Sequence, residues 1–390
     1  MDKNTNRKIG FNLKEIIVVI IVTALVTSLT TGVIVYNQNK LTKNLTYQDL
    51  NEDNALKEFL AVYANLIDQY YENVDKTAML ESAIGAMFNY LGEDYSTYMS
   101  KEESDALAEK LEGEYKGIGI EISKQDNTIV NFIEGGAAQE AGLQVGDKIT
   151  HVNGKEITNT SEITELIKNT KAGEKIKITI LRGEERLEFS IENKRIFYPN
   201  VKSEMKEEHI GYLQIATFSN TLKEQVNLAL DKLEPNDLHT LIIDLRNNTG
   251  GYLSAAKEVA SLFLEKGKVI YSLEEKEDTK TFKDESDEKR DYKIILLMNE
   301  GSASASEVLI AALQESYGAI TVGTTTYGKG KVQQTHTLED GSMVKYTSAK
   351  WLTPKGTCID EIGITPDYVI ENTSLDIDEQ LNKAIELARE

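Results

Sequence analysis

The sequence predicts a multidomain protein of mixed α/β and α+β class, and three observations lead to this fold class. A long uncharged segment near the N-terminus has the length of a transmembrane helix. Short β-like runs separated by turns, with small helices, fill the middle of the chain. Strands then alternate with helices along the C-terminal half, which is typical of an α/β core with a partly parallel sheet. A chain of 390 residues with 40% hydrophobic residues can form two or three such domains.

The N-terminal segment from Ile16 to Tyr36 contains no charged residue and is about 20 residues long, which suits a helix that crosses a bilayer. Lys3, Arg7, Lys8 and Lys14 precede it. The positive-inside rule therefore predicts a cytoplasmic N-terminus and an extracytoplasmic remainder of the chain. The alternative is a cleaved signal peptide, whose apolar region would be shorter, about 7 to 15 residues, and would be followed by a small-residue cleavage site. We favour an uncleaved single-pass anchor in the cell membrane.

After a polar linker, apolar residues recur at helical spacing from residue 54 to about 90 and predict two amphipathic helices. Residues 113 to about 195 then carry β-like runs such as "YKGIGIEIS" and "EKIKITILRG", with one helix-like piece, "SEITELIKN". Between residues 272 and 293 both charge signs are dense. This pattern favours a solvated loop or hairpin over an acidic partner site.

From Ile210 onward the predicted strands are "HIGYLQIATF", "LHTLIIDLRNN" and "YKIILLMNE". The helices predicted between and after them are "TLKEQVNLALDKLE", "GYLSAAKEVASLFLEKG" and "SEVLIAALQES". The stretch "GSASASE", residues 301 to 307, joins the last of these strands to the last helix. Its serines could begin a helix, or one of them could act as a nucleophile.

Composition limits the classes of function. The chain has 64 acidic and 43 basic residues, and its formal net charge is −21. Such a charge opposes nucleic-acid binding, because proteins bind phosphate backbones through lysine and arginine. A single cysteine, Cys358, excludes an internal disulfide, and the four histidines are scattered: His151, His209, His239 and His336. We therefore expect no metal site, no cofactor and no nucleic-acid partner.

Residues 319 to 334, "AITVGTTTYGKGKVQQ", partly match a phosphate-binding P-loop. Gly330 occupies the position where that loop needs a hydroxyl for Mg²⁺, and the chain continues as strand instead of helix, so we reject nucleotide binding. Lys329 on this glycine-flanked turn is either a solvated lysine or a general base. Burial lowers a lysine pKa toward neutrality, so a buried lysine can activate a serine. A triad with His336 is the weaker interpretation, because no orienting carboxylate is evident.

The segment "EGGAAQEAGLQVGDKITHVNGKEI" resembles a PDZ domain. This resemblance implies a peptide-binding groove whose carboxylate loop is "YKGIGI" and includes Gly117, Ile118, Gly119 and Ile120. The two glycines would let backbone N–H groups converge on a terminal carboxylate while a strand edge pairs with the peptide. The implied partners are proteins or peptides with free, apolar C-termini.

The motifs "IIDLRNNTGG", "LLMNEGSASASEVLIAAL", "VGTTTYGKGKVQQ", "LEDGSMVKYTSAKWLTPKG" and "EIGITPD" resemble, in this order, the carboxyl-terminal processing peptidases, also called tail-specific proteases. The resemblance implies Ser304 as the nucleophile, Lys329 as the general base and Gln333 as the residue that steadies the lysine. It further implies an oxyanion hole formed by the backbone N–H groups of Ala305 and Gly251.

The spacing Ser304-x-x-Glu307 also matches a helix capping box, in which the serine has no catalytic role. Since Lys329 and Gln333 stand in register with the family motifs, we favour catalysis. An N-terminal end of a helix suits this chemistry as well, because its unpaired N–H groups and positive dipole stabilise an oxyanion.

The resemblance implies a membrane-anchored, extracytoplasmic serine endopeptidase that recognises protein C-termini through its PDZ domain and cleaves with a Ser-Lys dyad. The alternative is an inactive PDZ scaffold that binds C-termini. A homo-oligomer is left open by the sequence. The predicted domains are a cytoplasmic tail (1–15), the anchor (16–36), a linker (37–53), a helical segment (54–100), the PDZ domain (113–195), the peptidase core (200–375) and a C-terminal helix (376–390).

Overall fold

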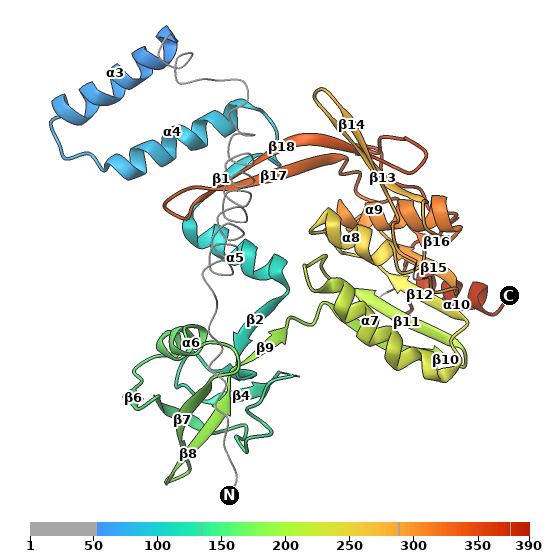
Figure 1. Ribbon diagram of the computed structural model, residues 1–390, viewed down its shortest axis with the longest axis horizontal. Helices are drawn as coiled ribbons and strands as arrows, with labels where there is room; N and C mark the ends of the chain where they lie inside the picture. Colours follow the sequence, from blue (N-terminus) through green and yellow to red (C-terminus); the bar gives the residue numbers. More distant parts are fainter. Residues whose placement is uncertain (1–52, 134, 288, 375) are drawn as a thin grey trace, which may run out of the picture. The chain divides into compact units, whose positions relative to one another are not determined.

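The structure is a computed structural model that describes residues 53–133, 135–287, 289–374 and 376–390 (Figure 1). The chain divides into two compact units, Met1–Ala83 and Ile84–Glu390. The predicted anchor at residues 16–36 lies outside the described residues. Within the described part of the chain, no helix is both long enough and apolar enough to cross a membrane.

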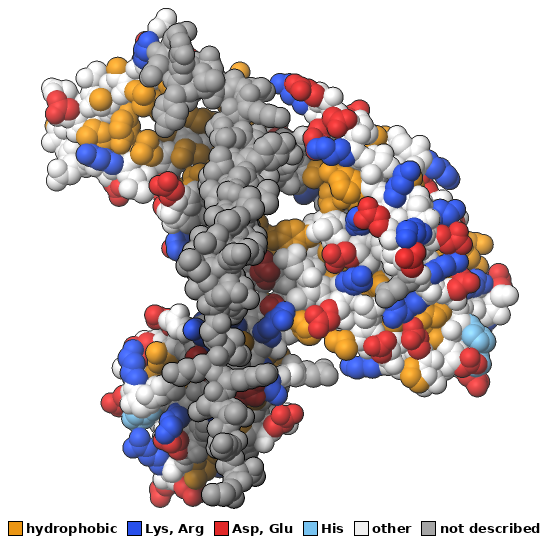
Figure 2. All heavy atoms as spheres, in the orientation of Figure 1, with side chains coloured by type: hydrophobic (Ala, Val, Ile, Leu, Met, Phe, Trp, Pro, Cys, Tyr) orange, Lys and Arg blue, Asp and Glu red, His pale blue; other side chains and the backbone are white. Residues whose placement is uncertain are grey.

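The two helices that the periodicity predicts are present: α3 (Asn54–Gln69) and α4 (Lys76–Tyr90). Asp53 caps α3, because its carboxylate accepts hydrogen bonds from the first free N–H groups of the helix. Neither helix contains a buried residue. Figure 2 shows hydrophobic side chains gathered on the exposed surface of these helices, where Leu60 is 53% exposed.

Residues 114–197 form a small β-rich domain around its own core of buried aliphatic side chains. Its elements are β2 (Glu114–Gly117), β3 (Ile120–Ile122), β4 (Ile129–Phe132), β5 (Lys148–Val152), β6 (Lys155–Glu156), α6 (Thr160–Lys168), β7 (Lys175–Arg182), β8 (Glu185–Glu192) and β9 (Lys194–Phe197). The run "YKGIGIEIS" is not one strand, because β2 pairs with β9 whereas β3 pairs with β4. The chain breaks at Gly119, whose φ of +79° suits glycine and whose Cα packs so tightly on Gly136 that a Cβ would lie 2.5 Å from it.

The C-terminal half contains a six-stranded sheet, which confirms the predicted α/β core. In sheet order its strands are β10 (Val201–Glu207), β11 (Ile210–Ile215), β12 (Thr240–Asp244), β15 (Lys293–Met298), β16 (Ile320–Gly323) and β19 (Tyr368–Val369). The edge strand β10 is antiparallel to β11, and all other neighbours are parallel. Because parallel strands end at one common edge, the loops after β12, β15 and β16 lie at the same side of the sheet.

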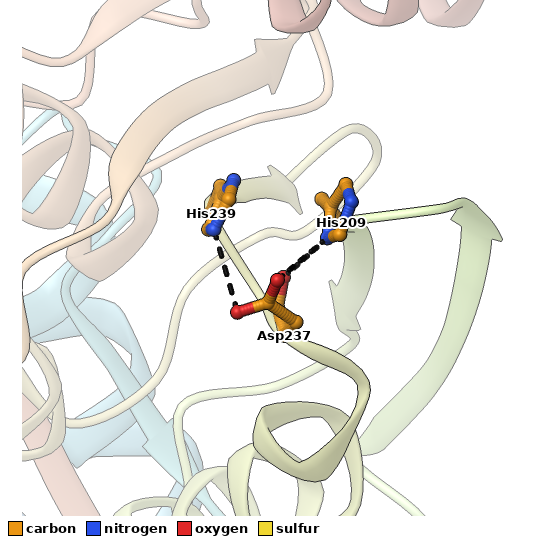
Figure 3. A group of neighbouring side chains, drawn as sticks. All are labelled: His209, Asp237 and His239. Carbon is orange, nitrogen blue, oxygen red and sulfur yellow. Dashed lines mark hydrogen bonds and ion pairs between the residues drawn. The ribbon is translucent and has the colours of Figure 1, made fainter.

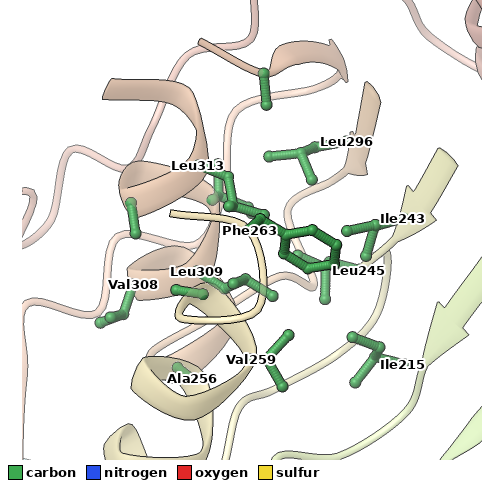
Figure 4. Packing of buried hydrophobic residues seen from close by; sticks show 14 of the residues in the cluster. Ile215, Ile243, Leu245, Ala256, Val259, Phe263, Leu296, Val308, Leu309 and Leu313 are labelled. Atoms are coloured by element: carbon green, nitrogen blue, oxygen red, sulfur yellow. The ribbon is translucent and has the colours of Figure 1, made fainter. Parts of the chain in front are cut away.

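Helices cover both faces of this sheet. All five residues of β12 are buried, and alternate residues belong to different clusters, with Ile243 on one face and Ile242 on the other. The first face is covered by α7 (Leu222–Leu233), α8 (Leu253–Ala260) and α9 (Ala305–Ala312), and the second by α10 (Glu379–Ala388). Helix α8 is shorter than predicted because the chain turns after Ala260 and buries Phe263 against Val259 and Leu309 (Figure 4).

A second, antiparallel sheet consists of β1 (Thr97–Met99), β18 (Met343–Leu352), β13 (Val269–Glu275) and β14 (Thr279–Lys283), with β17 (Lys331–Thr337) paired to β18. The charged segment 272–293 thus contains a hairpin, β13–β14. Lysine, arginine, aspartate and glutamate are interspersed over the face of the molecule drawn in Figure 2. Helix α5 (Lys101–Glu112) joins the start of this sheet to β2, and it begins with a capping box between Ser100 and Glu103.

Candidate active site

The turn between β15 and α9 sets its three serines in different environments. Ser302 and Ser306 are fully buried, and each hydroxyl donates to a backbone carbonyl, that of Leu245 at 2.8 Å and that of Asn248 at 2.7 Å. Ser304 is half-buried and lines a cleft. Two of the serines therefore hold the turn in place, and the third faces the space where a substrate could bind.

The backbone of Ser304 is strained, with φ of +57° and ψ of −117°. A non-glycine residue in this conformation costs on the order of 1–3 kcal/mol and persists only where its surroundings enforce it. The same kind of sharp strand-to-helix turn exposes the nucleophile in α/β-hydrolases. Here Ser304 is the N-cap residue of α9 and lines the cleft.

The turn is held by the fully buried carboxylate of Glu307. Its Oε2 accepts hydrogen bonds from the N–H groups of Ser304 at 2.8 Å and Lys329 at 3.0 Å. Its Oε1 accepts from Gly328 N–H at 2.7 Å and from the Thr326 hydroxyl at 2.6 Å. Burial raises the pKa of Glu307, and these four donors oppose that rise. One carboxylate oxygen thus joins the backbones of the predicted nucleophile and the predicted base.

Lys329 lies on the loop between β16 and β17, and its carbonyl accepts a 2.8 Å hydrogen bond from the indole of Trp351. Burial, together with the nearby charge of Lys345, lowers the pKa of Lys329. Its Nζ lies 4.7 Å from the centroid of the Tyr95 ring, a cation–π distance. Burial and a hydrogen bond to Tyr327 raise the pKa of Tyr95 to about 12, so this phenol is neutral at physiological pH.

Ser304 and Lys329 line the same cleft, whose volume is about 510 Å³. None of the hydrogen bonds among the described residues joins the Ser304 hydroxyl to Lys329 Nζ, because the ammonium lies over Tyr95. Gln333, which also lines the cleft, donates from its Nε2 to the hydroxyl of Thr347 at 3.3 Å. The structure therefore brings the three predicted side chains to one cleft without linking them to one another.

The glycine turn after β12 packs directly against Ser304. A Cβ on Gly250 would lie 2.8 Å from the carbonyl oxygen of Ala303 and 2.9 Å from the nitrogen of Ala305. Gly250 N–H donates to the Asn248 side chain at 2.9 Å. In contrast, no described hydrogen bond uses the N–H of Gly251 or that of Ala305. The two N–H groups predicted to form the oxyanion hole are therefore the ones that remain available.

Part of the lining of the cleft comes from residues that the sequence analysis did not single out. Helix α5 contributes Leu107, Lys110 and Leu111, and β18 contributes Lys345. Tyr95, more than 200 positions before Lys329, contacts the lysine from the segment that precedes β1. The role of Tyr95 is not evident from the sequence, because tertiary contacts, among them the pairing of β1 with β18, bring its segment to this cleft.

The small β domain carries a narrow groove between β3 and α6. It is lined by the 115–120 segment and by Ile122, Thr164, Ile167 and Lys168. Outside the strand ladders, no described hydrogen bond uses the N–H groups of Ile118 and Gly119. The Ile118 side chain is 1% exposed and belongs mainly to the core, so the apolar wall is formed chiefly by Ile120 and its neighbours.

Known proteins share both parts of this arrangement. Residues 209–370 match the peptidase family S41, residues 116–192 match the PDZ domain, and residues 23–103 match the activating protease CtpB N-terminal domain. A strand-to-helix serine turn on an α/β core, joined to a PDZ domain, defines a serine-type peptidase with protein or peptide substrates.

Two relatives more than 30% identical to this chain identify the family. A probable CtpA-like serine protease of Staphylococcus saprophyticus is 34% identical over 376 residues, which cover 95% of this chain and 76% of that protein. The carboxy-terminal processing protease CtpA of Bacillus subtilis is 36% identical over 360 residues, with 90% and 76% covered. The photosystem II D1 C-terminal processing protease, a solved structure, aligns with a TM-score of 0.48 and 24% identity over 84% of this chain and 91% of that one. The chain belongs to the carboxy-terminal processing proteases of peptidase family S41.

Proposed function

We propose that this protein is a membrane-anchored endopeptidase of the extracytoplasmic face, which selects proteins by their free C-termini and cleaves them with a Ser304–Lys329 dyad. The observation that carries the dyad is the contact of Glu307 Oε2 with the N–H groups of both residues. A shared carboxylate fixes the relative position of the two backbones. The lowered pKa of Lys329 supports the role of a base, because a neutral amine is needed to accept a proton.

In the proposed reaction, Lys329 Nζ leaves the Tyr95 ring and turns toward Ser304. The neutral amine takes the hydroxyl proton while Ser304 Oγ attacks the carbonyl carbon of the scissile peptide bond. The carbonyl oxygen becomes an oxyanion and accepts hydrogen bonds from the N–H groups of Ala305 and Gly251. The Lys329 ammonium then gives its proton to the leaving amine, and the C–N bond breaks to leave an acyl-enzyme.

Hydrolysis reverses these roles. Lys329 takes a proton from a water molecule, whose oxygen attacks the ester carbon of the acyl group on Ser304. The ester bond breaks, the proton returns to Ser304 Oγ, and the new C-terminus leaves. Gln333 steadies the lysine once its side chain turns from Thr347 toward Nζ. Every proton in this cycle is carried by side chains of this chain or by water, so the reaction needs no cofactor.

Substitution of the two dyad residues tests this mechanism. Ser304→Ala and Lys329→Ala should each abolish cleavage of an unstructured protein while the fold is retained, and the double variant should be no worse, because such units are non-additive. Lys329→Arg should also be inactive, since a guanidinium does not deprotonate. Lys350→Ala is the matched control, because Lys350 is exposed on the paired strand β18. Full activity in Lys329→Ala would refute the dyad.

The anchor and the membrane location rest on the uncharged segment 16–36 behind four basic residues. A reporter enzyme fused after Glu390 should be active only on the extracytoplasmic side, and the mature protein should keep its N-terminus and sediment with membranes. Recovery of a soluble chain that starts near Asn37 would identify the segment as a cleaved signal peptide.

A further inference from the structure

Two of the four histidines come together at the edge of the core sheet that lies away from the active site. His209 directly precedes β11 and His239 directly precedes β12, so parallel pairing of these strands sets the two residues side by side. Asp237 follows the short 3-10 helix η1 (Glu234–Asn236) and completes the cluster (Figure 3). The wide spacing of these residues in the sequence predicts no such group, because only the sheet register creates it.

The backbone fixes this cluster. The N–H groups of His239 and Thr240 both donate to the His209 carbonyl, at 3.0 and 3.1 Å, and thereby tie the two loops together. His209 and Asp237 have positive φ angles of 67° and 56°. Conformations of this kind persist for non-glycine residues only where the surrounding structure holds them. The constrained backbone therefore holds the side chains of His209, Asp237 and His239 close to one another.

The geometry suits a metal ion. His209 Nδ1 lies 3.3 Å from Asp237 Oδ2, and His239 Nε2 lies 3.4 Å from Asp237 Oδ1. Donor atoms at about 2.0–2.2 Å from a tetrahedral Zn²⁺ lie roughly 3.3–3.5 Å apart, which matches these separations. The two imidazole rings are stacked, with centroids 4.6 Å apart and an interplanar angle of 14°, and both turn a nitrogen toward the carboxylate.

We propose that His209, Asp237 and His239 form a binding site for one divalent transition-metal ion of the Zn²⁺ class. A donor set of imidazole and carboxylate binds Zn²⁺, Ni²⁺ and Cu²⁺ more strongly than it binds Mg²⁺ and Ca²⁺. His209 Nδ1 also lies 2.9 Å from the Asp237 carbonyl oxygen. Because Nδ1 is the ligand atom, the proton of the neutral His209 ring lies on Nε2, and Nδ1 turns from this carbonyl oxygen to the ion.

The remaining coordination positions are open to solvent. His239 and Asp237 are exposed, so water can complete the coordination of the ion. Ser304 follows β15 at the opposite edge of the sheet, so the ion takes no part in peptide cleavage. A metal at this edge instead links the loops before β11 and β12 and stabilises the folded core, because an ion that binds only the folded state shifts the folding equilibrium.

Calorimetric titration of the full-length chain with Zn²⁺ tests this proposal, with Ser304→Ala in all samples to prevent self-cleavage. We expect one Zn²⁺ per chain with a Kd on the order of micromolar and a higher Tm in Zn²⁺ than in EDTA. A large excess of Mg²⁺ should not displace the ion, whereas Zn²⁺ held only by the many acidic side chains would be displaced.

His209→Ala and His239→Ala should each weaken Zn²⁺ binding by at least about tenfold, and Asp237→Asn should weaken it as well. The matched control is His336→Ala, which removes an exposed histidine on β17 and should bind Zn²⁺ as the parent protein does. The Tm in EDTA verifies that each variant is folded. Failure of the parent protein to bind Zn²⁺, displacement of Zn²⁺ by Mg²⁺, or unchanged affinity in the histidine variants would overturn the proposal.

Discussion

At the scale of single residues, Lys329 and Glu307 decide whether Ser304 can react. Lys329 is half-buried and lies beside a second cation, Lys345, and both conditions disfavour its charged form. Glu307 is buried and holds the backbones of the nucleophile and the base through one oxygen. The sequence motifs indicate Ser304 and Lys329, whereas the spacing of Glu307 indicates only a helix cap. Its contact with Lys329 depends on tertiary structure, so no local pattern predicts it.

The lowered pKa of Lys329 predicts how cleavage depends on pH. Because the reaction needs the neutral amine, kcat/KM should rise with pH and level off above the Lys329 pKa, which lies below the usual lysine value of about 10.4. In Lys345→Ala a repelling charge is removed, the ammonium becomes more favourable, and the inflection should move to higher pH. Lys350→Ala should leave the inflection in place. An inflection that moves down in Lys345→Ala, or does not move, would contradict this electrostatic account.

Replacement of Glu307 by glutamine tests whether Glu307 positions the loops of Ser304 and Lys329 or only caps α9. The amide keeps the shape of the carboxylate but directs an NH₂ group at N–H donors, so the nucleophile and base loops lose a shared acceptor. We expect kcat to fall by about 10- to 100-fold with little change in KM, since small misplacements of reacting groups have effects of this size. Glu300→Gln, at an exposed carboxylate on the same turn, should retain full activity. Equal kcat in both variants would show that Glu307 only caps α9.

At the scale of elements, the turn after β12 and the turn after β15 form one unit. The sequence predicts both strands and an α/β core with a partly parallel sheet, because strands alternate with helices along this half of the chain. It does not predict the close packing of Gly250 on residues 303–305, since that contact joins two loops far apart in the chain. The break between β2 and β3 is missed for a related reason: the packing of Gly119 on Gly136 overrides a continuous β pattern.

Gly250→Ala should therefore lower kcat in addition to destabilising the fold. Gly250 has φ of +100°, and an added Cβ would press on Ala303 and Ala305. Gly318→Ala is a matched control, because Gly318 has φ of +93° but no atom within 4 Å of its Cβ position. Both variants should lose stability on the order of 1–3 kcal/mol by thermal unfolding, and only Gly250→Ala should lose kcat. Equal activity losses would mean that the turn does not shape the site.

At the scale of the whole molecule, a peptide-binding groove and a catalytic cleft occur in one chain. In the groove, the N–H groups of Ile118 and Gly119 can donate hydrogen bonds to a terminal carboxylate, and β3 has a free edge with which a peptide can pair. Substrates should therefore be selected by the groove and cut in the cleft. The PDZ resemblance makes the groove predictable from sequence, whereas the burial of Ile118 in the core is seen only in the structure.

Amidation of a substrate C-terminus should slow its cleavage. Loss of a charge-assisted contact with the carboxylate loop costs about 1.5–3 kcal/mol, or roughly ten- to a hundredfold in affinity. The effect should appear in KM and leave kcat unchanged, because the chemistry at Ser304 is the same for both ends. The comparison is one unstructured protein with a free and with an amidated C-terminus. Equal KM values would show that the groove does not read C-termini.

The central claim is that Lys329 makes Ser304, and no other serine, nucleophilic. The most direct measurement is the rate at which a serine-directed fluorophosphonate labels the intact protein, with the modified residue located by peptide mass spectrometry. We predict a single adduct on Ser304, a labelling rate that rises with pH, a loss of about 100-fold or more in Lys329→Ala, and no loss in Lys350→Ala. An adduct on Ser302 or Ser306, or an unchanged rate in Lys329→Ala, would contradict the account.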